Sequence, residues 1–282
     1  MPLPTLVFLI VLAVVVVYVA VWLFCIRPRQ SLDTIDMTEF KKYDYAHRGF
    51  YKKDQSIPEN SLPAFQRAVS KGFGVELDLQ LTADGQVVVF HDDTLKRMCG
   101  VDIPVSSVTW RELQHYTLAG TGEKIPLFTQ VLKVMAGKTP MIIELKPYNN
   151  TEELCQKACD LLIGYKGLWC IESFSPDVVK WFRKNRPEVV RGQLMAKFTH
   201  KDHSFNLITA FLARNLFVNV MGRPDFIAYD VKDRKNWSLR TACGLFHAQE
   251  VNWTIRTPQL LWSVKADGSM GIFEHFDPTQ QK

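Results

Sequence analysis

Charged residues lie two positions apart at the ends of short apolar runs in this chain of 282 residues. Glu76 and Asp78 close one such run, and Glu144 and Lys146 close another. In a strand, residues two apart point to the same face, so the three carboxylates are expected to share one face of a sheet. Buried together they would repel one another unless a cation lay among them. Oxygen ligands of this kind select Mg²⁺ or Ca²⁺ over zinc, which prefers Cys and His.

Two histidines occupy the same kind of position. Ala46-His47-Arg48-Gly49 closes the first apolar run after the N-terminal region, and His91-Asp92 closes a later one. In a barrel of parallel strands, residues at the carboxyl ends of the strands converge in space although they lie far apart in sequence. Each motif by itself also fits a structural role, as a solvated strand face, a turn or a surface ion pair. Their common position at strand ends favours one joint site.

Strand-like and helix-like stretches alternate from about residue 43 onward, which is typical of parallel βαβ units. The expected strands are Tyr43–Ala46, Gly74–Leu81, Gln86–His91, Met141–Leu145, Leu168–Ser173, Val189–Met195, Asp225–Tyr229, Leu245–Trp253 and Gly271–Phe273. The expected helices are Leu62–Lys71, Pro126–Ala136, Thr151–Ile163, Pro176–Asn185, Asn206–Asn215 and Asn236–Cys243. The apolar segment Asn206–Met221 is interpreted as a packed helix and strand rather than a membrane span. The roughly 240 residues involved are close to the usual size of a (β/α)8 TIM barrel.

The N-terminal region has a different character. No charged side chain precedes Arg27, and Leu6 to Ile26 is an almost unbroken apolar run. As a helix it would be roughly 31 Å long, enough to cross a hydrocarbon core. A cleaved signal peptide is the competing interpretation, but it requires a basic start and a small-residue cleavage site, which fit this sequence poorly. The sequence therefore predicts a transmembrane anchor over residues 1–26, a linker over 27–42 and a barrel over 43–282.

Charge and cysteine content narrow the expected partners and location. The basic residues flanking the apolar run all follow it, at Arg27, Arg29, Lys41 and Lys42, so the positive-inside rule places the barrel in the cytoplasm. The formal net charge of +5 comes without a dense Lys/Arg block, and nucleic acid is not an expected partner. The six cysteines include no CxxC pair, which argues against a zinc ribbon and a disulfide framework. The sequence does not indicate an oligomeric state.

An ordered series of motifs resembles the glycerophosphodiester phosphodiesterase family. The motifs are His47-Arg48-Gly49, Pro58-Glu59-Asn60-Ser61, Glu76-Leu77-Asp78, His91-Asp92-Asp93, Ile125-Pro126-Leu127, Glu144-Leu145-Lys146, Ser173-Phe174 and Trp253-Thr254. The resemblance covers nearly the whole domain from Tyr45 onward. It implies a TIM barrel with a small insertion after the His-Asp motif, here at about residues 94–124. It also implies hydrolysis of glycerophosphodiesters to glycerol 3-phosphate and an alcohol.

The resemblance further implies which residues carry out the reaction. Glu76, Asp78 and Glu144 would hold the divalent cation, Mg²⁺ or Ca²⁺. His47 and His91 would be the acid/base pair, with His91 favoured as the general acid and His47 as the base. Two histidines suit proton transfer near neutral pH, and a cation suits a transition state that spreads negative charge over phosphate oxygens.

Other positions of the resemblance imply binding and supporting roles. Arg48 would contact the phosphate, and Lys146 would add positive charge beside the cation. Glu59 and Asn60 are expected to order the site through hydrogen bonds, although a helix-capping role fits them equally. Trp253 is expected to line the substrate pocket, although a large aromatic side chain in a strand more often belongs to the core.

The C-terminal segment departs from the family pattern, and two other functions stay open. Where Gly-hydrophobic-Ile-Thr-Asp-x-Pro is common, this chain reads Gly271-Ile272-Phe273-Glu274-His275, so the loop after the last strand is expected to differ. An anchor beside a bilayer also suits hydrolysis of an intact or lyso-phospholipid on the same barrel. The third function is that of a non-catalytic, membrane-tethered binding barrel, but retention of both histidines and all three carboxylates argues against it.

Overall fold

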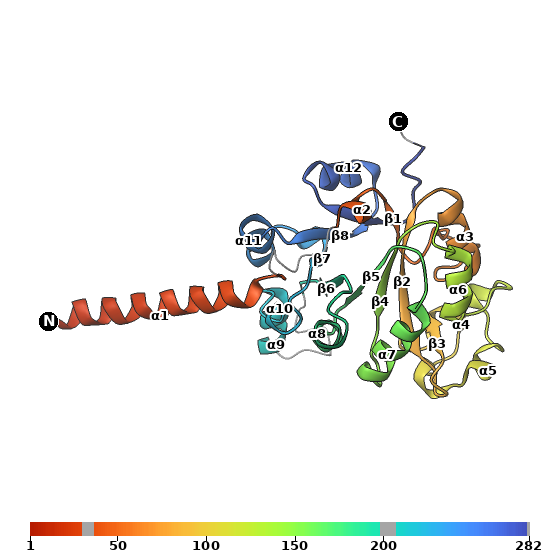
Figure 1. The fold of residues 1–282 in the computed structure, drawn as a ribbon, viewed down its shortest axis with the longest axis horizontal. Helices are drawn as coiled ribbons and strands as arrows, with labels where there is room; N and C mark the ends of the chain where they lie inside the picture. Colours follow the sequence, from red (N-terminus) through yellow and green to blue (C-terminus); the bar gives the residue numbers. More distant parts are fainter. Residues whose placement is uncertain (30–36, 198–206, 281–282) are drawn as a thin grey trace.

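The computed structural model describes residues 1–29, 37–197 and 207–280. Within this part of the chain, eight parallel strands form a closed barrel with helices on its outside (Figure 1). These strands are β1 (Tyr45–Ala46), β2 (Gly74–Leu81), β4 (Met141–Leu145), β5 (Trp169–Ser173), β6 (Arg191–Met195), β7 (Phe226–Asp230), β8 (Gln249–Ile255) and β9 (Met270–Phe273). The barrel closes because β1 pairs with both β2 and β9. The predicted TIM barrel is confirmed.

Helices cover the barrel, and several begin at a capping side chain. Ser61, Asn150, Asn236 and Thr257 each accept a hydrogen bond from a backbone N–H of the first helical turn, which would otherwise lack a partner. The covering helices are α3 (Leu62–Ser70), α6 (Phe128–Met135), α7 (Thr151–Leu162), α8 (Pro176–Asn185), α9 (Leu207–Arg214), α10 (Asn219–Gly222), α11 (Trp237–Phe246) and α12 (Pro258–Ala266).

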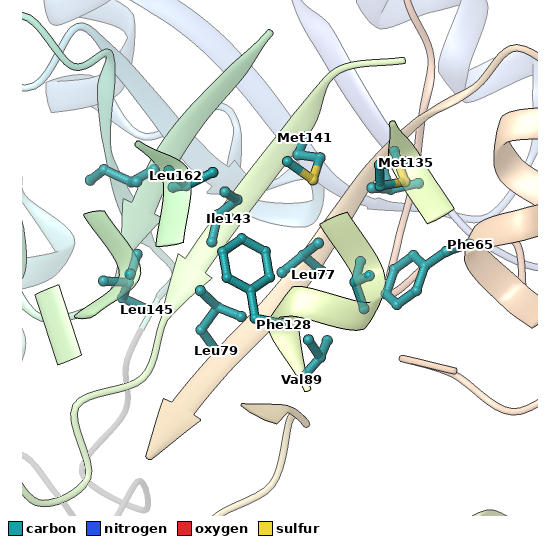
Figure 2. Close-up of a cluster of buried hydrophobic side chains, with 14 of the residues drawn as sticks. Phe65, Leu77, Leu79, Val89, Phe128, Met135, Met141, Ile143, Leu145 and Leu162 are labelled. Carbon is teal, nitrogen blue, oxygen red and sulfur yellow. The ribbon is translucent and has the colours of Figure 1, made fainter. Parts of the chain in front are cut away.

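Strand β2 shows how the sequence separates core from site. Its eight residues are all buried, but alternate side chains point in opposite directions. Leu77 and Leu79 point outward and lie in the same apolar cluster as Phe65 of α3 (Figure 2). Glu76 and Asp78 point the other way, into the barrel. The same strand therefore supplies both the main core and two of the expected metal ligands.

The amino end of the barrel is closed by apolar side chains. The short helix α2 (Thr38–Lys41) contributes Phe40 to a buried cluster that includes Tyr45 and Phe226, the first residues of β1 and β7. On β6, Gly192 leaves room for the Phe226 ring, since a Cβ there would lie 2.1 Å from it. The interior is thus filled at this end, and the polar side chains are left to the carboxyl ends of the strands.

Strand β3 (Val87–Val89) differs from the other described strands because it lies outside the barrel. It runs antiparallel to β2, pairing Leu79 with Val89. The short helices α4 (Lys96–Cys99) and α5 (Trp110–Leu113) follow it, and this region has a small apolar core of its own that includes Phe90 and Leu95. The predicted run Gln86–His91 is therefore a strand, but not one of the parallel βαβ series.

Two other features differ from the prediction. The expected strand Leu245–Trp253 is wrong at its start, because α11 continues to Phe246 and ends at His247, whose φ is +56°. Strand β8 begins only at Gln249. A short apolar run such as Leu245-Phe246 fits either element, so its pattern could not decide. Helix α12 had no counterpart in the prediction, although Thr257-Pro258 is a typical helix start.

The segment Asn206–Met221 was predicted as a helix followed by a strand. Its described part contains two helices and no strand. Its first residue lies outside the described residues, and α9 confirms the helix from Leu207 onward. The expected strand is wrong: after Leu216, which has φ +62°, the chain forms the short helix α10.

Helix α1 (Leu3–Ile26) projects away from the barrel (Figure 1). Its mean hydropathy reaches 3.2 over an 18-residue window, none of which is buried. By length and composition it is a candidate membrane span, a test that signal sequences near an N-terminus also pass. The described structure touches it at its C-terminal end, where Ile26 is fully buried and Trp22 Nε1 donates a hydrogen bond of 2.9 Å to Ser238 Oγ.

Candidate active site

A cavity of about 660 Å³ is formed by residues at the carboxyl ends of the barrel strands. Most of the residues expected to form the site line it, namely His47, Arg48, Glu59, Glu76, His91, Glu144 and Trp253. The remaining three, Asn60, Asp78 and Lys146, are buried just beneath and contact these lining residues or each other. The structure thus brings all ten predicted residues together.

Three carboxylates lie at the floor of the cavity, which Glu76 and Glu144 line, with Asp78 buried just beneath them. Glu76 and Asp78 come from β2 and Glu144 from β4, and the parallel pairing of these strands places Asp78 opposite Glu144. One oxygen atom of each lies within 4.8 Å of the others, and all three residues are buried. Lys146 Nζ lies 2.8 Å from Glu144 Oε1 and 3.3 Å from Asp78 Oδ1. Arg48 Nε lies 3.8 Å from Asp78 Oδ2, and Arg48 is shared with Glu59, so these two cations offset only part of the negative charge of the three carboxylates.

The pKa values reflect this excess of carboxylates. Burial, together with repulsion from Asp78 and Glu144, raises the pKa of Glu76 well above its usual value. Burial would also raise the pKa of Asp78, but Lys146 and the neighbouring His91 outweigh it and hold that pKa far below the usual range. The additional positive charge of a divalent cation among these oxygens would let all of them ionise. The three carboxylates could hold a divalent cation.

A fourth carboxylate, Glu172 on β5, was missed by the sequence analysis. It pairs with Glu144 across the two strands and lines the same cavity. Burial, with Glu144 and Asp78 nearby, raises its pKa well above the usual value. Its Oε2 is buried and has no hydrogen-bond partner among the described residues. An unpartnered buried oxygen beside three other carboxylates fits a cation site. Its place next to Ser173-Phe174, at a strand end, was the available signal.

His47, at the end of β1, is hydrogen-bonded to Glu274, the residue that follows β9. Its Nδ1 lies 2.7 Å from Glu274 Oε2. Burial opposes ionisation of Glu274, but the hydrogen bond from His47 holds the Glu274 pKa at about 2, so the carboxylate only accepts. The His47 hydrogen therefore lies on Nδ1, leaving Nε2 as a proton acceptor 3.9 Å from Glu76 Oε2. Burial lowers the pKa of His47 and favours this neutral form.

Glu274 itself has further partners. The Tyr51 hydroxyl donates to its Oε2 at 2.9 Å, and Arg256 Nε donates to its Oε1 at 2.8 Å. His275, given no role in the sequence analysis, lines the cavity and bonds to the Tyr51 hydroxyl at 2.8 Å. Glu274 and His275 occupy the segment that departs from the family pattern. The departure therefore places a carboxylate directly behind His47.

His91 also lines the cavity and comes from the segment just after β3. Its Nδ1 lies 2.7 Å from Asp92 Oδ1. Burial opposes ionisation of Asp92, but the hydrogen bonds from His91 and Arg97 hold the Asp92 pKa at about 2. The same reasoning as for His47 places the hydrogen on Nδ1 and leaves Nε2 free to exchange a proton.

Arg48 and its neighbours order the edge of the cavity. Arg48 adopts a left-handed backbone conformation, φ +53°, in which its N–H donates to Glu76 Oε2 at 3.0 Å. Its Nη1 donates to Glu59 Oε1 at 2.6 Å, and Asn60 Nδ2 donates to Asp78 Oδ2 at 2.7 Å. The capping role for helix α3 falls to Ser61. Glu59 and Asn60 are thus committed to site residues.

Trp253 supplies an apolar wall. Its ring lies 5.7 Å from that of Phe174, edge to face, and both side chains line the cavity. A mixed cavity of this kind, with a charged floor and an aromatic wall, suits a ligand that has an anionic part and a less polar part.

A closed parallel barrel with an acidic cluster, two histidines and an arginine at its carboxyl end defines a candidate phosphoryl-transfer or hydrolytic site. The sequence profile of the glycerophosphoryl diester phosphodiesterase family matches residues 47–228. This is more than half of the chain, and the chain belongs to that family. The resemblance stated from the motifs is confirmed.

Individual relatives agree with this assignment. The chain is 39% identical over 121 residues to a lysophospholipase D of Rattus norvegicus, covering 38% of each chain. It is 37% identical over 162 residues to a glycerophosphodiester phosphodiesterase of Caldanaerobacter subterraneus, covering 53% of this chain and 65% of that protein. The matches thus span less than two thirds of these relatives. A solved phosphodiesterase of Oleispira antarctica, in complex with sn-glycerol-3-phosphate, shares the fold with a TM-score of 0.66 at 21% identity, over 85% of this chain and 95% of that one.

Proposed function

We propose that this protein hydrolyses glycerophosphodiesters, releasing glycerol 3-phosphate and an alcohol, in a reaction that depends on a divalent cation. One observation carries the proposal: oxygen atoms of Glu76, Asp78 and Glu144 lie within 4.8 Å of one another at the floor of a cavity that His47 and His91 line. Membership of the family supports the same reaction.

The cation is Mg²⁺ or Ca²⁺, because the candidate ligands are carboxylate oxygens without Cys or His among them. When bound, it supplies positive charge to the phosphate oxygens as negative charge develops on them. Arg48 at the cavity edge and Lys146 beside the carboxylates add to that charge. Arg48 binds the phosphate with its planar guanidinium, and Lys146 limits the repulsion within the acidic cluster.

The histidines transfer the protons. His47 is the base, since its neutral form predominates and its Nε2 carries no hydrogen. His91 is the general acid: in its protonated form it carries a second hydrogen on Nε2, which it gives to the alcohol oxygen as the bond from that oxygen to phosphorus breaks. Its side chain is 31% exposed, against 15% for His47, so the leaving group departs on the more open side of the cavity. Trp253 packs against the alcohol portion, while Glu59 and Asn60 keep Arg48 and Asp78 in place.

We also propose the chain organisation and its location. Residues 1–26 are a transmembrane anchor, residues 27–42 a linker, and residues 43–282 the catalytic barrel. The barrel has an insertion at about residues 94–124, which begins shortly after His91. The contacts of the half-buried Trp22 and the fully buried Ile26 with the barrel support retention of α1 in the mature protein, since a cleaved signal peptide would leave the barrel without them. The basic residues that follow α1 favour a cytoplasmic barrel. Protease added outside sealed spheroplasts should then leave the barrel intact.

A lysophospholipid is the second candidate substrate. The rat relative is a lysophospholipase D, and an anchor beside a bilayer would bring a lipid substrate close to the cavity. Both substrates present a phosphodiester to the same residues. They differ in the acyl chain, which would have to lie against the aromatic wall or outside the cavity.

A substrate panel on the full-length protein in detergent tests these proposals together. Glycerophosphocholine, glycerophosphoethanolamine and lysophosphatidylcholine are supplied in turn, with EDTA and then with Mg²⁺ or Ca²⁺ restored. We expect activity that EDTA abolishes and one of the cations restores, that His47→Ala abolishes, and that His115→Ala in the exposed part of the insertion retains. Absence of hydrolysis with every substrate and cation would instead favour the non-catalytic binding barrel.

A further inference from the structure

The last turns of α1 pack against the barrel, so they are not available to span a membrane. Trp22 is bonded to Ser238 at the start of α11, and Ile26 is fully buried in a cluster with Leu216 and Tyr229. The Arg223 guanidinium lies 4.7 Å from the Phe24 ring and donates to the Phe24 carbonyl oxygen. These contacts fix the helix end to the outer wall of the barrel.

The length of helix that remains is only just enough for a bilayer. Leu3 to Val21 is exposed along its length and, at about 1.5 Å per residue, is roughly 28 Å long. A hydrocarbon core is about 30 Å thick. If α1 spans the membrane, as proposed above, no spacer separates the bilayer from the barrel. The barrel surface beside Tyr18 and Trp22 must then lie at the lipid interface itself.

That surface is apolar where it would meet lipid. The Phe217 ring lies 6.5 Å from Tyr18 of α1 and 6.1 Å from Phe211 of α9. Helix α9 buries Ala210 and Ala213 against the protein, yet its opposite face is also apolar. The exposed side chains there are Leu207, Ile208, Phe211 and Leu212, with Leu207 and Ile208 more than 70% exposed. Such a patch, continuous with a candidate membrane helix, is unusual on a soluble surface.

The surroundings of this patch have the composition of a membrane interface. Trp237, 84% exposed, directly precedes Ser238, which bonds to Trp22 of α1. The guanidinium of Arg214 lies 5.6 Å from the Phe211 ring, at the end of α9. Trp237 is exposed and Arg214 is half-buried. Tryptophan and arginine side chains at a protein surface favour the headgroup layer, where an apolar body meets lipid and a polar part meets water or phosphate.

We propose that the exposed face of α9, together with Trp237, is a second membrane contact that lies in the interfacial layer of a phospholipid bilayer. Figure 1 shows α1 leaving the barrel between α11 and the α9–α10 pair, so these contacts flank the anchor on two sides. Three points of contact would hold the barrel in one orientation relative to the membrane. The cavity would then keep a fixed height and direction above the lipid headgroups. This inference rests on the proposed membrane span of α1.

Photo-crosslinking of the full-length protein in phosphatidylcholine/phosphatidylglycerol vesicles tests it. Benzoylphenylalanine is placed at Ile208 on α9 in one variant. The matched control carries it at Ile163, the residue after α7, which is 71% exposed against 72% for Ile208. A third variant carries it at Val14 in the middle of α1. Because all three side chains are exposed, the probe displaces no core packing.

We expect lipid adducts at position 208 at a yield at least tenfold above position 163 and within about threefold of position 14. Adducts at 14, with 208 no higher than 163, would overturn the second contact and leave the anchor standing. Absence of lipid adducts at 14 as well would overturn both. Adducts at 208 that join two protein chains instead of lipid would assign the face to a second copy of this chain and would also overturn the inference.

Discussion

The two histidines of the cavity are oriented in the same way, by a hydrogen bond from Nδ1 to a carboxylate, but the two carboxylates come from different parts of the fold. His47 is fixed by Glu274, so one barrel strand is tied to another and the pair is well buried. His91 is fixed by its neighbour Asp92, which Arg97 of the insertion holds in turn at 2.7 Å. The His47 side belongs to the barrel wall, since β1 and β9 are barrel strands. The His91 side is attached to that wall, since it follows β3, which lies outside the barrel. Orientation of an imidazole by an ionised carboxylate therefore does not require a particular scaffold.

The difference in burial should separate the consequences of disturbing each side. The Glu274 side chain is only 5% exposed, so loss of its charge leaves the buried His47 without a partner that solvent could readily replace. Asp92 is more open, and water can take over part of its hydrogen bonding. The following predictions test this contrast, beginning with the largest effect.

Removal of either imidazole should lower the rate of hydrolysis by a similar, large factor. We expect His47→Ala and His91→Ala each to lower kcat by about 10³-fold, since each would lose one proton transfer. The measurement is steady-state hydrolysis of glycerophosphocholine at saturating cation. Loss on one side only would mean that a single histidine serves both steps and that the comparison of the two sides is mistaken.

Glu274→Gln should have the next largest effect. The amide can donate to Nδ1, which moves the His47 hydrogen to Nε2 and blocks proton acceptance. We expect kcat to fall about 10²-fold with KM changed less than threefold, because the substrate contacts stay in place. Glu274→Asp should recover part of the loss. A KM effect larger than the kcat effect would instead assign Glu274 to substrate binding.

The free energy of unfolding should also depend on the charge of Glu274, and it should therefore fall in acid. Because the folded-state pKa of Glu274 is about 2, below its usual 4.5, its contribution is present above about pH 4.5 and is lost as pH falls toward 2. We expect this to remove on the order of 2 kcal/mol of unfolding free energy across that window. Urea unfolding of Glu274→Gln should show a correspondingly shallower decline. Glu152→Gln, on the exposed side of α7, should decline as the unmodified protein does.

Asp92→Asn should have the smallest effect. We expect kcat to fall about fivefold, since water and Arg97 can still restrict the His91 ring. The test is the ratio of the Asp92→Asn and Glu274→Gln losses, measured on one substrate. A loss for Asp92→Asn equal to or above that for Glu274→Gln would show that the attached side is the more strictly organised one.

Local sequence patterns explain why much of the site could be predicted. The alternation in β2 assigns Glu76 and Asp78 to the barrel interior whatever the neighbouring strands are. The apolar residues between them need an outer covering, which the amphipathic helices provide. The residues at strand ends then converge because parallel strands all end on the same side.

The residues that were missed depend on pairings that no local pattern contains. Glu274 faces His47 only because β9 lies beside β1, and the sequence gives no sign that a nonstandard C-terminal motif would supply such a partner. Glu172 lay at a strand end and was visible in principle. The antiparallel course of β3 depends on a tight reversal after β2, and its length and composition alone did not distinguish it from a barrel strand.

Closure of the barrel through β1 has a consequence for biosynthesis. The first barrel strand emerges from the ribosome soon after α1, but its partner β9 is made much later, because His47 and Glu274, which follow these two strands, are 227 positions apart in sequence. An N-terminal helix already committed to the membrane would therefore hold β1 near the lipid surface while it waits for the end of the chain. The closed barrel, and with it the cavity, can form only after β9 has been made, so a product truncated before β9 would lack the site.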